Sequence, residues 1–499
     1  MTPETAFNKL YKGIKKEWKI AFGSTVLIGL LAHGYKFMNN LPNWDSLMDY
    51  YYPTHNMIHQ GRQFQFLPAS FRGFADLPWV IGLLSLLYMG IAAVLLVEIL
   101  EMHDTLSIII ATGLIAVSPT IISHWGFMFT ADCYFFGYLL AVLAVYLTIQ
   151  KRYGWVVGGI CLGVSMGIYQ AGLPLAMALI LLWMIKEISS SFWKKVGSFF
   201  LMGITAAVVY SGTLRVMLGL EQQTLDGHQG MGSLHIPGIR EIFHAMMNSY
   251  IDTVYYFVGS LSDLSFYGIL NMLCMLALVI LLVRYARNTG IFHQPGKVLV
   301  FLLCLALYPC VSHLFYFVTD DIFYHSLMQF PLVLLYVLLF WLYERDEQKK
   351  SWLSWGTVIS ALFLMGTLIV TANQAYRAET LSYEKTYAMV NRIVDRMEQL
   401  PEYEEAKEIA VVGYWEQAGE SIYGTSPALA GYTDSFFITH QKHVVAMLNE
   451  YFGVELQGVS DEELERISDL PEVQEMPVWP KAESVMQTGD MIILKLGEN

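Results

Sequence analysis

Apolar runs long enough to cross a lipid bilayer recur along most of this chain. A transmembrane helix needs about 20 predominantly apolar residues, and runs close to this length are separated here by short polar connections. We identify about eleven candidate spans, which predict an all-α polytopic membrane domain. They cover residues 20–37, 78–100, 106–122, 131–149, 154–169, 173–185, 196–218, 266–283, 298–318, 322–343 and 355–372.

The composition also indicates a membrane protein. Of the 499 residues, 55% are hydrophobic and only 15% are charged, whereas soluble domains carry roughly 25% charged residues. The net charge of −13 says nothing about nucleic-acid binding, because the acidic residues concentrate near the C-terminus. We expect no nucleic-acid partner. The cysteines show neither a disulfide framework nor metal-ligand spacing, so we expect no metal and no cofactor.

The charges between the spans predict the orientation in the membrane. Residues 1–19 are basic and amphipathic, which is typical of a cytoplasmic surface, and the first span reads as a retained helix without a signal-peptide cleavage pattern. Lys and Arg recur in every second connection, except in 101–105, which has none. An odd number of spans places the C-terminal region outside. We therefore predict a transmembrane domain at 20–376 and an extracytoplasmic domain at 377–499.

The region 377–499 contains no span and predicts a small α/β domain. We expect helices at 381–400 and 440–452, and a further helix after the capping box at Ser460–Glu463. Strands are expected at 408–414 and 491–496. Upstream, the stretch 242–258 is apolar but interrupted by polar residues, and we interpret it as a helix lying among the lipid headgroups.

Ionisable residues are nearly absent from the middle of the spans and gather at the predicted outer ends of the helices. Transporters usually keep such residues at mid-membrane, so this pattern favours a reaction centre at the outer rim. The first outer loop carries Asp45, Asp49, Arg62 and Arg72. A helical turn would place the two aspartates on one face, because they are four residues apart. Later connections contribute His124, Asp132, Arg215, Asp320, Asp321 and His325.

Three short motifs resemble the bacterial GtrII-type glucosyltransferases. They are Asn-Trp-Asp at 43–45, Thr-Ala-Asp-Cys-Tyr at 130–134 and Gly-Ile-Tyr-Gln-Ala at 167–171, where the short fifth and sixth spans meet. The resemblance covers roughly residues 20–372 and depends on the order and spacing of the motifs. It implies a GT-C-like architecture. It also implies transfer of a sugar from a polyprenyl-phosphate donor to a cell-surface polysaccharide on the outer face of the cytoplasmic membrane.

The resemblance also assigns acidic positions. The class keeps an acidic residue in the first outer loop, which Asp45 matches, and another at the outer end of a later helix, which Asp132 matches. Asp45 and Asp132 are therefore the catalytic candidates, and the nearby Asp49 is a candidate for substrate binding. Glycosyl transfer to a hydroxyl needs a carboxylate that takes its proton, and we assign this role to Asp45. We expect an inverting, metal-independent enzyme. Its donor would be a polyprenyl-phosphate-linked hexose, with glucose favoured, and its acceptor a cell-envelope glycan or glycolipid.

The remaining candidates would bind the substrates. A departing lipid phosphate needs cationic or hydrogen-bonding stabilisation at the headgroup level. Arg72 and Arg215 lie beside predicted span ends, and Arg62 is a third option. Groups that could orient sugar hydroxyls are Asp132, Tyr169, Gln170 and His325.

Each assignment also has a structural alternative. An aspartate at a helix start is often a cap, and an arginine at a span end is more often an anchor that snorkels to the interface. His325 would then be a packed interfacial residue, and tyrosines 50–52 would mark the headgroup belt. For the whole protein, one alternative is a flippase for lipid-linked sugars, although the spans offer almost no polar track. Another is a surface receptor that binds through the C-terminal region.

Overall fold

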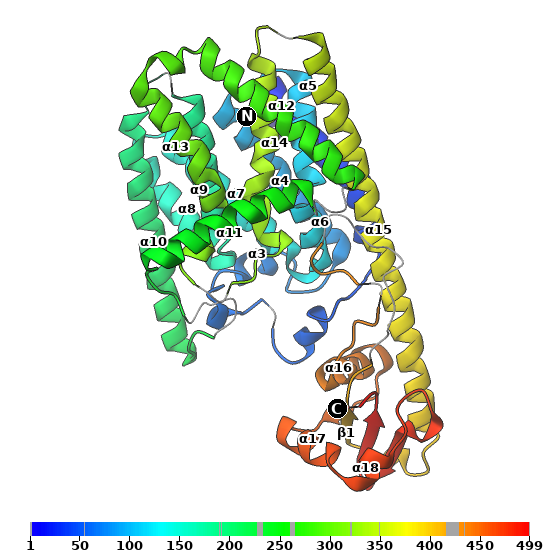
Figure 1. Ribbon diagram of the computed structural model, residues 1–499. Coiled ribbons are helices and arrows are strands. Elements are labelled where there is room, and N and C mark those ends of the chain that lie inside the picture. Colours follow the sequence, from blue (N-terminus) through cyan, green and yellow to red (C-terminus); the bar gives the residue numbers. More distant parts are fainter. Residues whose placement is uncertain are drawn as a thin grey trace. The chain divides into compact units, whose positions relative to one another are not determined.

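The chain folds as two compact units. The computed structural model describes residues 2–53, 55–188, 190, 192–226, 233–259, 265–319, 322–348, 350–415, 429–433 and 435–498. Unit 1 comprises Met1–Asn39, His55–Asn373 and Thr425–Ala430, and unit 2 comprises Asn40–Thr54, Gln374–Gly424 and Gly431–Asn499. Part of the first predicted outer loop therefore groups with the C-terminal region, which the predicted domain limits did not anticipate (Figure 1).

Each predicted span overlaps a helix of the structure. Within the described residues, nine helices are long and apolar enough to cross a membrane, and two shorter apolar helices, α8 (Gly154–Ile168) and α9 (Gly172–Lys186), lie between them. The long ones are α2 (Lys16–Met38), α4 (Pro78–Leu100), α5 (Thr105–Ala116) with α6 (Pro119–Gly126), α7 (Met128–Gln150), α10 (Trp193–Glu221), α12 (Phe266–Asn288), α13 (Pro295–Ser312), η6 (Ser326–Gln329) with α14 (Phe330–Arg345), and α15 (Ser351–Glu398). The shorter helices of unit 1 are α1 (Pro3–Gly13), η2 (Ile58–Gln60), α3 (Phe66–Ser70), α11 (Ile239–Val258), η4 (Ile291–His293) and η5 (Leu314–Phe317).

The predicted limits of two neighbouring spans were wrong. We expected spans at 298–318 and 322–343, but α13 ends at Ser312 and η6 begins only at Ser326, with the 3₁₀ helix η5 between them. Pro309 lies in the last turn of α13. Proline removes a backbone donor and clashes with the preceding turn, which favours ending the helix close to it.

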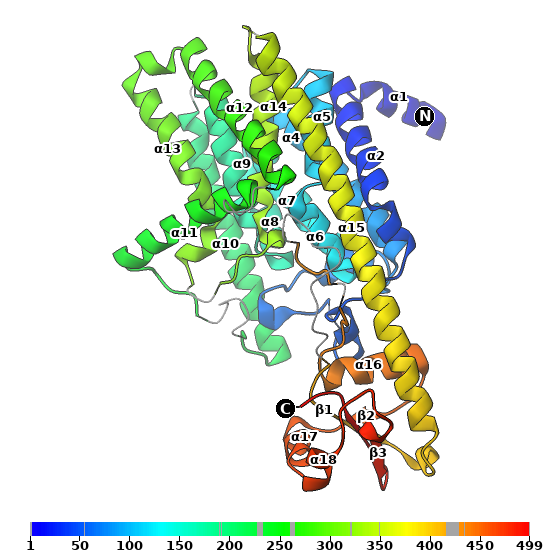
Figure 2. The same ribbon diagram turned by 45° about the vertical axis from the view of Figure 1, so that its right-hand side comes forward.

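Small residues allow the helices of unit 1 to pack closely. Helices α2, α4, α7, α8 and α10 pack successively against one another, and the long helices run side by side in both views (Figures 1 and 2). Gly159 and Gly163 on α8 face α10, where an added Cβ would come within 2.4 Å of Thr205 Cβ and 2.8 Å of Val209 Cβ. Such small residues four positions apart let helix backbones approach in membranes.

Helix α11 differs from the bundle helices in direction. It runs obliquely across them in both views (Figures 1 and 2). Phe243, Ile251 and Tyr255 are exposed, whereas Ala245 and Ser249 are buried. The predicted amphipathic helix is therefore present, and its position among lipid headgroups remains a prediction.

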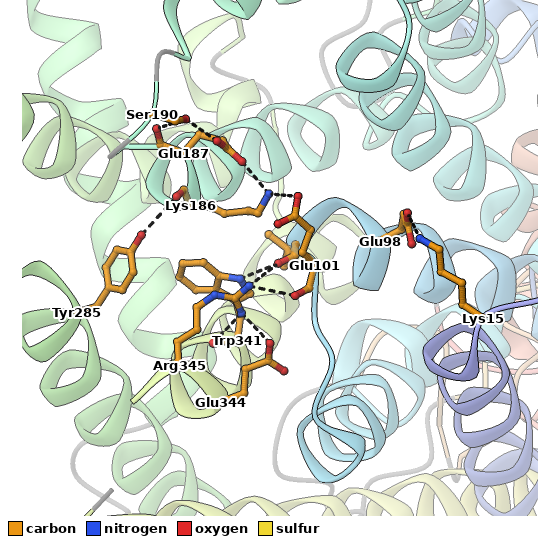
Figure 3. Close-up of polar contacts among 11 residues, drawn as sticks. Lys15, Glu98, Glu101, Lys186, Glu187, Ser190, Tyr285, Trp341, Glu344 and Arg345 are labelled. Carbon is orange, nitrogen blue, oxygen red and sulfur yellow. Dashed lines mark hydrogen bonds and ion pairs between the residues drawn. The ribbon is translucent and has the colours of Figure 1, made fainter. Parts of the chain in front are cut away.

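The connection between α4 and α5 lacks its own cation, but other helices supply positive charge (Figure 3). Lys186 Nζ on α9 lies 2.9 Å from Glu101 Oε1. Arg345, the last residue of α14, donates hydrogen bonds to the carbonyls of Leu100 and Glu101 at 3.3 and 3.0 Å. The C-terminal end of a helix favours positive charge, so Arg345 stabilises the end of α4.

The neighbouring carboxylate completes this arrangement. Glu344 accepts hydrogen bonds from the backbone N–H groups of His103 and Asp104, immediately before α5. A helix N-terminus favours negative charge. The adjacent Glu344 and Arg345 thus hold both ends of the α4–α5 turn, which has no Lys or Arg of its own.

Unit 2 contains a four-stranded sheet in the order β2-β1-β4-β3. Strand β1 (Glu408–Val412) pairs in parallel with β2 (Gln457–Gly458) and β4 (Met491–Lys495), and β3 (Val485–Thr488) is antiparallel to β4. One sheet face packs on α15 and α16 (Gln441–Phe452), and the other on α17 (Asp461–Ser468) and α18 (Pro471–Glu475). Two 3₁₀ helices, η7 (Tyr403–Glu405) and η8 (Ala482–Ser484), complete this part of the chain. The predicted strands and amphipathic helices are confirmed.

Helix α15 joins two elements that the sequence analysis separated. It contains 48 residues, whereas we predicted a span at 355–372 and a separate helix at 381–400. The stretch after Gly366 contains neither Gly nor Pro until Pro401, so nothing in it interrupts the helix. The limit between the two units falls inside α15, between Asn373 and Gln374.

Candidate functional site

The loop that follows His55 is anchored in unit 1 by a buried ion pair. Arg72 Nε lies 3.1 Å from Asp132 Oδ2, and neither side chain is exposed. Arg72 also donates hydrogen bonds to the carbonyls of Ala75 and Phe129, and to His55 Nε2 at 3.2 Å. This guanidinium therefore has little capacity left for a ligand.

Arg62 has a different environment. It is half-buried, its Nη1 lies 3.4 Å from the Tyr134 hydroxyl, and its guanidinium lies 5.5 Å from the centre of the Tyr169 ring. No carboxylate within the described part of the chain pairs with it, and its Nε is buried without a hydrogen-bond acceptor. A partly buried cation without a counter-ion, at the end of a membrane bundle, is a candidate for binding an anion.

The corner between α8 and α9 holds the loop in place. The Gln170 amide donates to the carbonyls of Gln60 and Gly61 at 2.9 and 3.2 Å. The backbone N–H of Phe64 donates to the Gly167 carbonyl at 2.7 Å. A Cβ at Gly167 would lie 2.5 Å from the Phe64 ring, so glycine permits this close approach.

A cavity of about 510 Å³ lies beside this corner. Gln170, Tyr210, His235 and Thr319 provide polar groups in a mainly apolar lining. Arg62 lies within electrostatic range of Tyr210. This volume and lining are typical of small-molecule sites, and the half-buried guanidinium is close to it.

The profile of the family described as Glucosyl transferase GtrII matches residues 34–342, which is more than half of the chain. The chain belongs to this family. No curated protein and no solved structure gives a match. The GtrII match runs from within α2 to within α14, so it contains the buried ion pair, Arg62 and the α8–α9 corner, and stops before the sheet of unit 2.

The GtrII match also contains Asp45 and Asp49, which lie in unit 2. Both side chains are exposed, and Asp45 precedes the 3₁₀ helix η1 (Ser46–Tyr50). A 3₁₀ helix has about three residues per turn, so residues four apart point about 120° away from each other. The two carboxylates therefore do not share a face as an α-helical turn would require. Leu47 instead belongs to the core of unit 2.

The tyrosines after Asp49 also contact unit 2. Tyr51 donates its phenol hydrogen to the Lys442 carbonyl at 2.9 Å, and the Asn449 amide donates to the Tyr50 hydroxyl at 2.6 Å. Burial raises the pKa of Glu450, and the charge of Asp49 raises it further. This segment packs on α16, a tertiary contact that no local sequence pattern indicates.

The other predicted site residues are more scattered. Arg215 is exposed on α10 and makes no hydrogen bond or ion pair with the described residues. His325 is half-buried and lies within electrostatic range of the fully buried His124. Nearby, the Ala430 N–H donates to the hydroxyls of Ser123 and Ser326 at 3.2 and 3.1 Å. Asp320 and Asp321 lie outside the described residues.

Sequence reasoning missed one carboxylate of unit 1. Tyr316 on η5 donates its phenol hydrogen to Asp252 Oδ2 on α11, at 2.6 Å. The two residues are 64 positions apart. The only available signal was an aspartate that interrupts an amphipathic helix, and it did not identify the partner.

Proposed function

We propose that this GtrII-family protein is a glucosyltransferase that uses a polyprenyl-phosphate-linked sugar. The acceptor is a glycan or glycolipid of the cell envelope, and transfer occurs at the outer face of the cytoplasmic membrane. Family membership supports the glucosyltransferase chemistry. The observation that carries the choice of a lipid-phosphate donor is Arg62, a half-buried guanidinium without a carboxylate partner among the described residues, near a mainly apolar cavity.

In this proposal Arg62 binds the phosphate of the donor. Hydrogen bonds between a guanidinium and a phosphate are charge-assisted and strengthen as negative charge develops on the leaving group. Tyr169 holds the guanidinium through its ring, and Gln170 holds the backbone beside Arg62. We assign Arg72 and Asp132 to positioning this loop, because their charges already compensate each other.

Asp45 remains our proposed base. The acceptor hydroxyl loses its proton to the carboxylate while its oxygen bonds to the anomeric carbon. The bond from that carbon to the phosphate oxygen breaks, and its electron pair stays on the phosphate. This displacement inverts the anomeric centre and needs no metal. The proposed orientation places residues 1–19 in the cytoplasm and the C-terminal region outside, as the cationic connections suggest.

The function is tested with undecaprenyl-phosphate glucose and a membrane fraction that supplies acceptor. Wild-type protein should transfer glucose to the lipid- or glycan-bound fraction. Asp45→Asn should lower kcat by at least about 100-fold, the lower end of what a general base contributes, while leaving donor binding intact. Near wild-type transfer by this variant would disprove the base assignment, and no transfer by the wild type would disprove the function.

A further inference from the structure

Asp252 lies on the inward side of an amphipathic helix. Ser249 and Tyr256, three and four positions away on α11, are both buried, so all three residues share one helix face. Asp252 itself is half-buried. An ionisable residue on the inner face of a membrane-associated helix is costly and suggests a function.

The carboxylate of Asp252 is only partly used by the protein. The Tyr316 hydroxyl donates to Oδ2, and no other hydrogen bond or ion pair from the described residues reaches Asp252. By contrast, the carboxylates of Asp132, Asp226 and Glu241 each have a guanidinium or imidazole nitrogen at 3.1–3.7 Å. An ionised carboxylate offers about four acceptor positions, so Asp252 can accept further hydrogen bonds.

Beyond Tyr316, the side chains of Tyr324 and His313 lie within electrostatic range of this carboxylate. The Tyr316 and Tyr324 ring centres lie 4.6 Å apart, and the His313 ring centre lies 4.9 Å from that of Tyr324. His313 Nδ1 lies 3.1 Å from the Pro309 carbonyl, which can only accept a hydrogen. Nε2 is then the acceptor of the neutral ring, and it is buried without a partner among the described residues.

This cluster adjoins the proposed phosphate site. Tyr324 lies within electrostatic range of both Asp252 and Tyr169, and Tyr169 carries the Arg62 guanidinium over its ring. Phe315, next to Tyr316 on η5, lines the cavity. Tyr169 and Tyr324 therefore link Arg62 to Asp252.

We propose that Asp252, Tyr316 and His313 bind hydroxyl groups of the transferred sugar and so contribute to sugar specificity. This inference depends on the proposed function. A carboxylate and an imidazole nitrogen accept hydrogen bonds from sugar hydroxyls. The phenol oxygen of Tyr316, whose hydrogen goes to Asp252, can accept another, and the tyrosine rings offer apolar surfaces to the C–H groups of the sugar. A site built to hydrogen-bond a substrate hydroxyl discriminates strongly against the analogue that lacks it.

The competing explanation is purely structural: the Asp252–Tyr316 hydrogen bond would only hold η5 against α11. The two explanations differ in how an enzyme substitution combines with a change in the sugar. If Asp252 contacts a sugar hydroxyl, the loss in kcat/KM from substituting Asp252 and the loss from removing that hydroxyl are not additive. If the substitution only loosens the helix, it lowers transfer of every donor by the same factor.

The experiment measures kcat/KM for undecaprenyl-phosphate glucose and for its 2-, 3-, 4- and 6-deoxy analogues. We compare wild type, Asp252→Asn and Tyr316→Phe, with His244→Gln as a control on the exposed face of the same helix. Wild type should lose about 10- to 150-fold in kcat/KM with at least one deoxy donor, as expected for a hydrogen bond to a charged group. Asp252→Asn should lose a similar factor with the glucose donor and little more with that deoxy donor. His244→Gln should keep the wild-type discrimination.

The inference would be overturned if Asp252→Asn lowered kcat/KM by the same factor for all donors. It would also be overturned if Asp252→Asn left transfer unchanged. If Asp252→Asn does not fold, which its thermal unfolding in detergent would show, the same comparison is made with Tyr316→Phe. The test separates the two proposals. If the wild type transfers glucose but the losses from Asp252→Asn and from the deoxy donors are additive, only the sugar site is refuted. If the wild type transfers no sugar from any donor, the proposed function is refuted as well.

Discussion

Arg72 Nε lies 3.1 Å from Asp132 Oδ2, with both side chains fully buried. The pair connects the loop after His55 to α7, and the same guanidinium bonds to His55 within that loop. Sequence reasoning gave these residues separate roles in phosphate binding and catalysis. Their mutual neutralisation favours a positioning role, and it leaves Arg62 as the available cation beside the α8–α9 corner.

Breaking this pair from one side should destabilise the protein. Asp132→Asn leaves a buried guanidinium uncompensated, which costs about 3–5 kcal/mol, so we expect a lower unfolding temperature in detergent and a lower yield. The double variant Arg72→Met with Asp132→Leu should recover part of the loss, because it leaves no buried charge. A single variant as stable as wild type would contradict the inferred burial of the pair.

Removing Arg62 should weaken donor binding with little change in stability. Arg62→Met breaks no ion pair, but it removes charge-assisted hydrogen bonds to phosphate that are worth about 1.5–3 kcal/mol. Binding of undecaprenyl phosphate should therefore fall roughly 10- to 150-fold. Arg240→Met is the matched control, since Arg240 is exposed at the start of α11. Equal binding by wild type and Arg62→Met would remove Arg62 from the site.

The contact between α8 and α10 should be sensitive to a single methyl group. A Cβ at Gly159 would lie 2.4 Å from Thr205 Cβ, and forcing extra volume into a packed interface costs about 1–3 kcal/mol. Gly159→Ala should lower the unfolding temperature. Gly203→Ala on α10, where a Cβ would meet nothing within 4 Å, should not. If the two variants unfold at the same temperature, the helices do not approach as closely as described.

Unit 2 should lose stability in acid through His443. Burial, together with a smaller effect of the neighbouring His440, lowers the pKa of His443 to about 4. The unfolded chain, with a histidine pKa of about 6.5, then binds a proton more readily than the folded unit. Stability is therefore fully present above pH 6.5 and is lost as the pH falls toward 4.

Hydrogen exchange of the α16 peptide in the full-length protein measures this effect, after correction for the intrinsic pH dependence. Protection should fall between pH 6.5 and 4 in wild type and change less in His443→Gln. His293→Gln, which alters an exposed histidine, should behave as wild type. If protection of the α16 peptide in wild type did not change between pH 6.5 and 4, His443 would not be a source of acid sensitivity in unit 2.

Regular patterns in the sequence predicted the regular elements. Long apolar runs identified the membrane helices, short apolar runs identified β1 and β4, and an amphipathic pattern identified α16. The errors occurred where tertiary packing decides the conformation. Pro309 and η5 shortened one predicted span, and the segment around Leu47 joined the core of unit 2. Asp252 carried no recognisable motif, because its partner Tyr316 comes from a distant part of the chain.

The sequence by itself determined that this chain forms membrane helices and a polar α/β region, because the length and periodicity of apolar runs are local properties. It also contained the short motifs of the GtrII family. Only the tertiary structure decided which arginine can bind a ligand. Arg62 and Arg72 carry the same charge and lie in the same loop, but folding buries Arg72 against Asp132 and leaves Arg62 without a carboxylate among the described residues. The availability of a charge depends on what lies beside it in space, and distance along the chain does not reveal this.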